Sequence, residues 1–349
     1  MSLLITKPYS SRGGVYSFVM NVLPFFSQKV YVFHRGKNPQ IRNKVYLLLL
    51  ILLNPIFFYI KIKKTNPTYV IVNTSLNLNL IIRDGILVLL SILLRKKTLL
   101  IVHGFRENAL KYKLLLKIGY FKADAIIVLA SEFKKKITNI GYTKKIYTQF
   151  NPVSCDILDF QNDVSHKIFS RRIKQVLFLS RIEKEKGIYI AIEVFKLLLK
   201  QNKELVFHIA GSGSEYNNVK EQLKKGNSDK IILHEFVEGK EKNHLLQQSD
   251  ILLFPTSNEG LPINVLEAMI VGMFIVTRPV GGLIDLYQKN PFGICLGSTD
   301  PQDFAEAIIE IINDKKRIIK IRQQNMVFAK ENFHPSAITN NIERILLDL

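Results

Sequence analysis

Two glutamates, Glu259 and Glu267, lie eight residues apart in a segment whose local structure can be predicted. The apolar run Ile251–Phe254 before them predicts a buried strand, and a turn of small and polar residues follows it. Pro262 suits the first position of a helix, where its missing N–H is no loss. A helix over residues 262–270 would put Glu259 in the loop at the helix N-terminus and Glu267 in its second turn.

The chemistry of this segment suits a ligand that carries both phosphate and hydroxyl groups. The unpaired N–H groups and the dipole of a helix N-terminus attract anions. An ionised carboxylate only accepts hydrogen bonds, so both glutamates suit the hydroxyls of a sugar or a ribose. Together these features favour a nucleotide-sugar site. The plainer alternative is a capping acid at Glu259 and a solvated helix residue at Glu267, and this segment alone leaves both interpretations open.

Other predicted strands in the second half of the chain end in residues that suit a diphosphate. Arg181 and Lys186 follow the strand 175–180, and they could hold phosphate oxygens through a planar guanidinium and a point charge. Glycine loops follow two further strands: Gly211-Ser-Gly213 after 205–210, and Gly281-Gly282 after 274–277. A solvated turn would explain any one of these loops. Several of them at one edge of a parallel sheet favour a ligand site.

The first half of the chain has candidates of its own. Gly13 and Gly14 lie between the strand 3–5 and a helical pattern, where backbone N–H groups could approach a phosphate, although a plain tight turn is the alternative. His103 follows the strand 99–102 and is a candidate for the site, although a structural histidine is the more common occurrence at a strand end.

Strands alternate with helices along most of the chain, which favours parallel sheets in doubly wound α/β domains. The alternation stops at Asn151-Pro-Val153, which suits a hinge, and a polar, irregular stretch follows before the strand at 175. We therefore expect a Rossmann-like N-terminal domain over 1–153, a second Rossmann-like domain over 154–332, and a C-terminal helix over 333–349 that could pack back on the first domain.

The net positive charge is confined to the first half of the chain. Residues 1–151 hold 24 Lys and Arg against 4 Asp and Glu, which leaves +20, whereas residues 152–349 hold 25 of each kind. This asymmetry implies an anionic partner for the N-terminal domain. An anionic membrane surface, a lipid diphosphate and a nucleic acid are the candidates. The chain has no nucleic-acid recognition motif, so we expect no nucleic acid.

The run Val45–Ile60 is apolar, is flanked by basic residues and is interrupted by Asn54-Pro55. As a helix its sixteen residues would extend roughly 24 Å at 1.5 Å per residue, which is short of the ~30 Å hydrocarbon core. We therefore expect no transmembrane span. A core helix and a helix lying in a membrane surface, with its lysines on lipid phosphates, both remain open.

The start of the chain and its cysteines suggest the cellular compartment. Met1–Pro8 has no long apolar segment of the kind found in a signal peptide. Cys155 and Cys295 form no metal-binding spacing. We therefore expect a cytoplasmic protein without a structural zinc site.

With these motifs in place, the chain resembles the retaining glycosyltransferases of the GT-B fold, in the large family 4 also called glycosyl transferases group 1. The resemblance covers nearly the whole chain and is strongest over 175–290. The segment from Glu259 to Glu267 matches the family's signature of two glutamates separated by seven residues. The segment Ser180–Gly187 matches its Arg…Lys-Gly phosphate motif. The fold implied is two Rossmann-like doubly wound domains facing across a cleft.

The resemblance also implies roles for individual side chains. Glu259 would accept hydrogen bonds from hydroxyls of the donor sugar, and Glu267 would hold the ribose. Arg181 and Lys186 would neutralise the diphosphate as it leaves. His103 would lie near the donor sugar and the reacting centre.

The remaining matched positions would bind the diphosphate or the sugar through their backbone: Gly13, Gly14, Gly211, Gly213, Gly260 and Leu261. The chain has no Asp-x-Asp motif, so no metal and no cofactor are expected, and the nucleotide-sugar is a substrate. Two positions depart from the family pattern. Glu235 replaces a glycine in the turn beside the base, and Asp285 replaces a glutamate after the Gly281-Gly282 loop.

The function implied is transfer of a sugar, with retention, from a UDP- or GDP-sugar to a saccharide acceptor bound by the N-terminal domain. The charge and the run 45–60 favour a lipid-linked acceptor, as in surface-polysaccharide assembly, and attachment to the inner face of the membrane. The alternatives are a soluble acceptor and a catalytically silent GT-B subunit that supports a partner. Intact Glu259, Glu267, Arg181 and Lys186 favour an enzyme.

Overall fold

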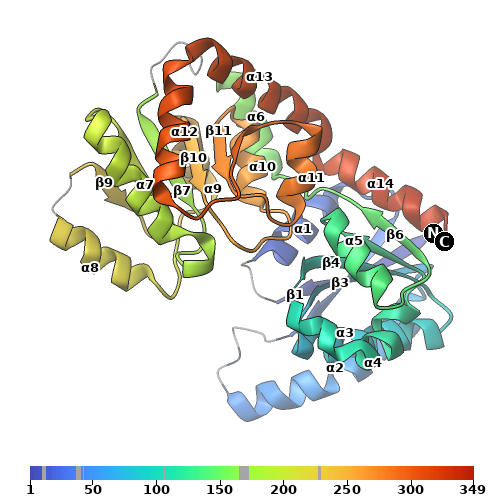
Figure 1. The fold of residues 1–349 in the computed structure, drawn as a ribbon. Helices are drawn as coiled ribbons and strands as arrows, with labels where there is room; N and C mark the ends of the chain where they lie inside the picture. The colour runs from blue at the N-terminus through green and yellow to red at the C-terminus, as the bar shows by residue number, and fades with distance from the viewer. Residues whose placement is uncertain (10–12, 37–40, 42, 106, 165–172, 227–228) are drawn as a thin grey trace. The chain divides into compact units, whose positions relative to one another are not determined.

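The computed structural model describes residues 1–9, 13–36, 41, 43–105, 107–164, 173–226 and 229–349. The chain divides into two compact units, one made of Met1–Pro152 and Pro335–Leu349 and the other of Val153–His334. Each unit is built on a six-stranded sheet with parallel pairing, and helices connect the strands (Figure 1). This confirms the predicted α/β class with two Rossmann-like, doubly wound domains.

The first unit has the strand order β2-β1-β3-β4-β5-β6. Its strands are β1 (Ser2–Pro8), β2 (Lys29–Arg35), β3 (Tyr69–Leu76), β4 (Lys97–Phe105), β5 (Ala125–Val128) and β6 (Lys145–Thr148). Its helices are α1 (Gly14–Val22), α2 (Lys44–Thr65), α3 (Leu78–Leu93), α4 (Lys113–Ile118), α5 (Ser131–Asn139) and α14 (Pro335–Leu347), with the 3-10 turns η1 (Leu23–Phe25), η2 (Glu107–Tyr112) and η3 (Tyr120–Lys122).

Alternate side chains of the strands in this first sheet point to its two faces, and each face has its own apolar core. Phe58, Leu87 and Leu116 bring α2, α3 and α4 into the core on one face. Phe18 and Ile342 bring α1 and α14 into the core on the other face. The C-terminal helix therefore belongs to the first unit, although residues 153–334 precede it in the chain.

The second unit has the strand order β12-β11-β10-β7-β8-β9. Its strands are β7 (Gln175–Leu179), β8 (Val206–Ala210), β9 (Ile231–Leu233), β10 (Ile251–Phe254), β11 (Phe274–Thr277) and β12 (Gly293–Cys295). Its helices are α6 (Cys155–Val164), α7 (Ile188–Gln201), α8 (Tyr216–Gly226), α9 (Gly239–Gln248), α10 (Ile263–Ile270), α11 (Gly282–Lys289), α12 (Pro301–Asn313) and α13 (Lys315–Asn332), with the 3-10 turn η4 (Lys184–Lys186).

From β7 the chain adds β8 and β9 toward one edge of this second sheet, and from β10 it adds β11 and β12 toward the other edge. The order therefore reverses between β7 and β10, which are neighbours in the sheet. In open parallel sheets this switch point leaves a crevice at the carboxyl ends of the strands, because the chain leaves the two strands in opposite directions. The loop with Arg181 and Lys186 follows β7, and the loop with Glu259 follows β10. The topology therefore brings the two candidate loops to the same place.

Several elements differ from the sequence prediction. The stretch predicted to be irregular contains α6, which packs on α9 and α10. The short edge strand β6 was not predicted. The helix expected over 45–60 extends over Lys44–Thr65 and includes Pro55. Among the described residues, no helix is long and apolar enough to cross a membrane.

Candidate active site

An ion pair joins the loops that follow β7 and β10. Lys186 Nζ donates a hydrogen bond to Glu259 Oε1 at 2.7 Å and another to the carbonyl oxygen of Asn258 at 2.8 Å. Both side chains of the ion pair are largely buried, with 8% of Lys186 and 14% of Glu259 exposed. The structure thus brings together two of the predicted site residues, which lie 73 positions apart in the sequence.

Backbone geometry holds this pair in place. Gly187 has a φ of 79°, and a Cβ atom there would lie 2.2 Å from the carbonyl oxygen of Pro255. Only glycine therefore allows the loop after β7 to pack this closely on the loop after β10. The backbone N–H of Ser257 donates to the carbonyl oxygen of Glu185 at 2.9 Å, which fastens the two loops again.

The electrostatics of Glu259 reflect opposing influences. Burial raises the pKa of its carboxyl group, whereas the positive charges of Lys186 and Arg181 and the hydrogen bonds of Lys186 and Thr256 lower it, and the net direction is upward. Arg181 is therefore close enough to act on Glu259 electrostatically. Its guanidinium group contacts Glu183 at 2.6 Å, and its side chain is 59% exposed. The loops thus present a largely buried carboxylate, Glu259, which is paired with Lys186, and a second cation, Arg181, which is exposed to solvent.

The second candidate acid, Glu267, lies on α10 and has a lysine partner that sequence reasoning missed. Lys242 Nζ, on α9, donates to Glu267 Oε1 at 2.5 Å. The helix α10 begins at Ile263 with Pro262 as its N-cap, one residue later than predicted, and Glu267 still lies in its second turn. No sequence signal pairs Lys242 with Glu267, because the contact depends on how α9 crosses from the sheet edge back to β10.

The loop after β11 supports the backbone of Glu259. Gly281 has a φ of 51°, and a Cβ atom there would lie 2.0 Å from the carbonyl oxygen of Glu259. The N–H of Gly282 donates to the carbonyl oxygen of Gly260 at 2.5 Å. Leu261 is buried next to them in the chain. These contacts fix the path of the segment 259–261, in which the amides of Gly260 and Leu261 are predicted to bind the donor.

The structure gives Gly211 and Gly213 a packing role. A Cβ atom on Gly211 would lie 1.9 Å from the carbonyl oxygen of Ser180, and one on Gly213 would lie 2.3 Å from that of Ile182. The N–H of Ile182 donates to the carbonyl oxygen of Ser212 at 3.0 Å. The close approach of these two loops is therefore enough to explain why both residues are glycines. Their role in donor binding stays a prediction.

In the first unit, Gly13 and Gly14 lie at the start of α1. Gly13 has a φ of 107°, which favours glycine, and it is the N-cap of the helix. No described atom lies within 4 Å of a Cβ built on either residue. Binding of a phosphate by Gly13 and Gly14 stays a prediction.

His103 lies inside β4, close to its carboxyl end. Its Nε2 is 2.9 Å from Asn73 Oδ1, and its ring meets Phe18 edge-on with centroids 4.6 Å apart. Asn73 Nδ2 donates to the carbonyl oxygen of Thr6, so Asn73 Oδ1 accepts and Nε2 of His103 carries the proton. Nδ1 is buried without a hydrogen-bond partner among the described residues. Burial lowers the pKa of His103 to about 3, so the imidazole is neutral and presents an acceptor.

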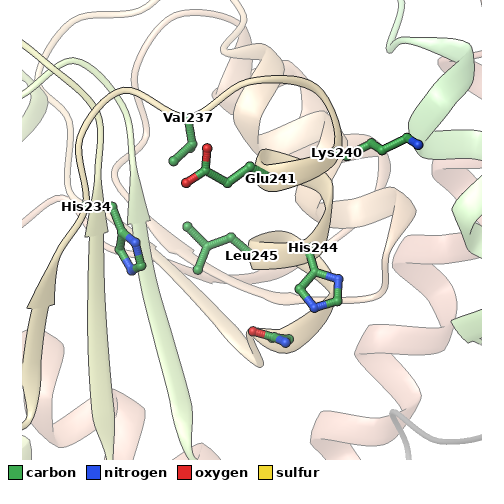
Figure 2. A pocket seen from close by; sticks show the side chains of 7 residues that line it. His234, Val237, Lys240, Glu241, His244 and Leu245 are labelled. Atoms are coloured by element: carbon green, nitrogen blue, oxygen red, sulfur yellow. The ribbon is translucent and has the colours of Figure 1, made fainter.

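A hollow of about 470 Å³ lies beside α9 (Figure 2). His234 faces it from the end of β9, and Glu241, His244 and Leu245 face it from the helix. His234 Nε2 is 2.9 Å from Nδ1 of His208, and burial lowers the pKa of both imidazoles. None of the predicted site residues lines this hollow. It does adjoin the turn 233–236, which the family resemblance places beside the base.

In the described part of the chain, no group of three His, Cys, Asp or Glu side chains is arranged to hold a metal ion.

Comparison with known proteins agrees with this architecture. Residues 162–328 match the family model described as glycosyl transferases group 1. This finding supports the group 1 family for the chain. The match lies wholly within the second unit, which contains the Lys186–Glu259 pair and Glu267.

Two curated relatives carry glycosyltransferase names. The uncharacterized glycosyltransferase MJ1607 of Methanocaldococcus jannaschii is 28% identical over 211 residues, which covers 56% of this chain and 53% of the relative. The capsular polysaccharide biosynthesis glycosyltransferase CapM of Staphylococcus aureus is 24% identical over 253 residues, which covers 69% of this chain and 66% of the relative. The chain thus spans about half to two thirds of the length of these relatives.

A solved structure shares the fold over the whole chain. Anabaena Alr3699/HepE in complex with UDP-glucose has a TM-score of 0.72 and 16% identity, with 100% of both chains covered. The fold of the present protein is that of the GT-B glycosyltransferases, as the family resemblance implied.

Proposed function

We propose that this protein is a retaining glycosyltransferase that moves a sugar from a nucleotide-sugar to a saccharide acceptor. The observation that carries the proposal is the pairing of Lys186 with Glu259 at the switch point of the second sheet. Glu267 lies on the helix that follows Glu259. A nucleotide-sugar contains a sugar, a diphosphate and a ribose, and each part needs a different one of these three side chains. The fold places all three side chains in one unit.

In the proposed chemistry, each side chain interacts with a charge or a hydroxyl group of the donor. Glu259 accepts hydrogen bonds from the donor sugar, and Glu267 accepts them from the ribose. Breaking the bond between the anomeric carbon and the phosphate oxygen builds negative charge on the leaving diphosphate. Lys186 and Arg181 stabilise that charge, which is the largest kind of catalytic contribution available to such a site. The acceptor oxygen bonds to the anomeric carbon on the same face, and its proton passes to the leaving phosphate.

For the donor, we propose a UDP- or GDP-sugar. HepE, which shares this fold, has been solved with UDP-glucose, and this supports a nucleotide-sugar. For the acceptor, we propose a lipid-linked saccharide in surface-polysaccharide biosynthesis, at the inner face of the membrane. CapM is named for capsular polysaccharide biosynthesis, and the +20 charge of residues 1–151 favours an anionic membrane as a partner. A soluble acceptor is the alternative.

The test is a panel of nucleotide-sugars offered with a lipid extract, using the protein and its Glu259→Gln variant. Glutamine keeps the shape of the side chain. It removes the negative charge of the carboxylate that pairs with Lys186 and accepts hydrogen bonds from the sugar hydroxyls. We expect transfer to fall by roughly 100-fold or more, with the fold retained by circular dichroism. The matched control is Glu193→Gln, which removes an exposed carboxylate of α7 paired with Lys196.

Two outcomes would contradict the proposal. Transfer by the Glu259→Gln variant at the normal rate would remove Glu259 from the site. Protection from thermal unfolding by a nucleotide-sugar, without transfer or hydrolysis under any condition of the panel, would favour the catalytically silent subunit.

A further inference from the structure

Exposed apolar side chains of the first unit gather on three helices. They come from α2 (Leu49, Leu52, Leu53, Ile56, Phe57, Tyr59, Ile60), from α3 (Ile82, Ile86, Leu89, Leu93) and from α4 (Leu114, Leu115, Ile118). Among the described apolar residues, the most exposed on each of the three helices are Leu52 at 65%, Leu93 at 75% and Leu114 at 70%. Isolated exposed apolar residues are common on proteins, but a contiguous group of this size marks an interaction surface.

These side chains lie on one side of the first unit, because the three helices cover the same face of the first sheet. The inner residues Phe58, Leu87 and Leu116 enter one core on that face, so the exposed residues of the same helices point away from the sheet. The helices α2 and α3 pack side by side, as do α3 and α4 (Figure 1). On α3 the exposed residues recur at intervals of three or four, which forms a stripe along one side of the helix. The outer face is thus a layer of three adjacent apolar stripes.

The exposed charges on these three helices have one sign. The three helices contain a single acidic residue, Asp84, which is fully buried. Exposed cations lie at the end of α2 (Lys63 and Lys64) and along α4 (Lys113 and Lys117). A surface that combines exposed leucines and isoleucines with exposed lysines matches the acyl chains and the phosphates of an anionic lipid surface.

We propose that the outer face of α2, α3 and α4 docks on an anionic phospholipid bilayer, with the helices lying in the plane of the headgroups. Since no described helix can cross a membrane, the exposed apolar side chains enter the boundary of the acyl chains while the lysines stay at the phosphates. A second copy of the chain is the less suitable occupant, because it would bring the same lysines face to face.

The inference extends what the sequence predicted from residues 45–60 alone. It adds α3 and α4 to the surface and makes the apolar and the basic residues act together. It rests on the proposed function only for its purpose, which is to bring the enzyme to a lipid-linked acceptor. Binding to vesicles needs neither donor nor acceptor, so the two proposals can fail separately.

The experiment measures flotation of the protein with vesicles of phosphatidylcholine alone and of phosphatidylcholine mixed with phosphatidylglycerol. The wild-type protein should bind the mixed vesicles, and added salt should weaken the binding. The variant L52Q/L93Q/L114Q changes the most exposed residue of each helix and should bind roughly tenfold or more weakly. The variant K113E/K117E should lose its preference for the anionic vesicles.

Matched controls change exposed residues of the same kinds elsewhere. I232Q/V327Q/L347Q replaces three exposed apolar residues outside the surface, and K224E/K225E reverses two exposed lysines of α8. Both controls should bind as the wild type does. Equal binding by L52Q/L93Q/L114Q and its control would overturn the inference, as would indifference to phosphatidylglycerol. If the protein forms a dimer without lipid, and L52Q/L93Q/L114Q dissociates that dimer whereas the control variants do not, the surface would bind a second copy of the chain instead.

Discussion

At the scale of single residues, each candidate acid has a lysine from a separate loop or helix as its partner. Lys186 contacts Glu259 and Lys242 contacts Glu267. A buried carboxylate needs such a partner, because losing its water without compensation is costly. An ionised carboxylate has about four acceptor positions, so one ammonium group leaves capacity for the hydroxyls of a sugar. The lysines therefore orient the acids without preventing them from binding a ligand.

Replacement of Lys242 by Met tests this for the second pair. Met keeps most of the length of the side chain but removes the ammonium group from Glu267, and the carboxylate loses the contact that orients it. A ribose contact stabilises the bound substrate and the transition state alike, so its loss should raise the KM for the donor by roughly tenfold with little change in kcat. Steady-state kinetics with varied donor measures this. Lys240→Met changes an exposed lysine of the same helix and should leave KM unchanged; an equal effect of the two substitutions would speak against the role.

We expect His103 to make the stability of the first unit sensitive to acid. Its pKa is lowered to about 3 in the folded protein, against 6.5 for the unperturbed group, because it is buried. The unfolded chain therefore binds more protons between these values, and the free energy of unfolding falls as the pH drops from 6.5 toward 3. The contribution is at most about 1.4 kcal/mol per pH unit.

His103→Gln should flatten this part of the pH dependence. Denaturant unfolding at a series of pH values, followed by a probe in the first unit, measures the slope. The exposed His244→Gln is the control and should keep the wild-type slope. If both variants retain it, another group is responsible for the acid sensitivity.

At the scale of elements, Gly281 links the loop after β11 to the backbone of Glu259. Gly281→Ala would force a positive φ on an alanine and place its Cβ 2.0 Å from a carbonyl oxygen, so the loop must move. Displacing a substrate-positioning group by about 1 Å can lower the rate by about 100-fold. We expect a large loss of kcat/KM together with a lower Tm. Gly297→Ala is the control, since no described atom lies within 4 Å of a Cβ at that position. Equal activities of the two variants would mean that the loop does not position Glu259.

The elements that the sequence predicted well are those with a strong local pattern. Continuous apolar runs such as Ile251–Phe254 identified the strands, and the strand β10 formed by this run is buried along its whole length. The helix α6 was missed because half of the residues in Cys155–Val164 are polar and the segment follows a proline-containing hinge, although it packs against α9 and α10 in the structure. The ion pair of Lys242 was missed for a related reason. It joins residues 25 positions apart through the crossing of one helix over the sheet, and no local pattern encodes that crossing.

At the scale of the whole molecule, the end of the chain completes the unit in which the chain begins. Ile338, Ile342, Ile345 and Leu346 of α14 are buried in one core of the first sheet, together with Leu3 and Ile71. Gln149 Nε2 donates to the carbonyl oxygen of Ile338 at 3.1 Å. The first unit is therefore assembled from both ends of the sequence, and the second unit lies between them in the chain.

Deletion of residues 335–349 should consequently unfold the first unit and spare the second. Each buried apolar side chain of α14 stabilises by about 1.5–3 kcal/mol, and the loss of four approaches the whole stability of a domain, about 5–15 kcal/mol. Hydrogen exchange resolved by segment should show protection lost over 1–152 and kept over 153–334. Among point variants, Ile342→Ala should cost about 2–5 kcal/mol, whereas Leu347→Ala, which is exposed, should cost little. Equal loss of protection in both units would instead mean that the two units unfold as one cooperative body, in which α14 stabilises residues far outside its own core.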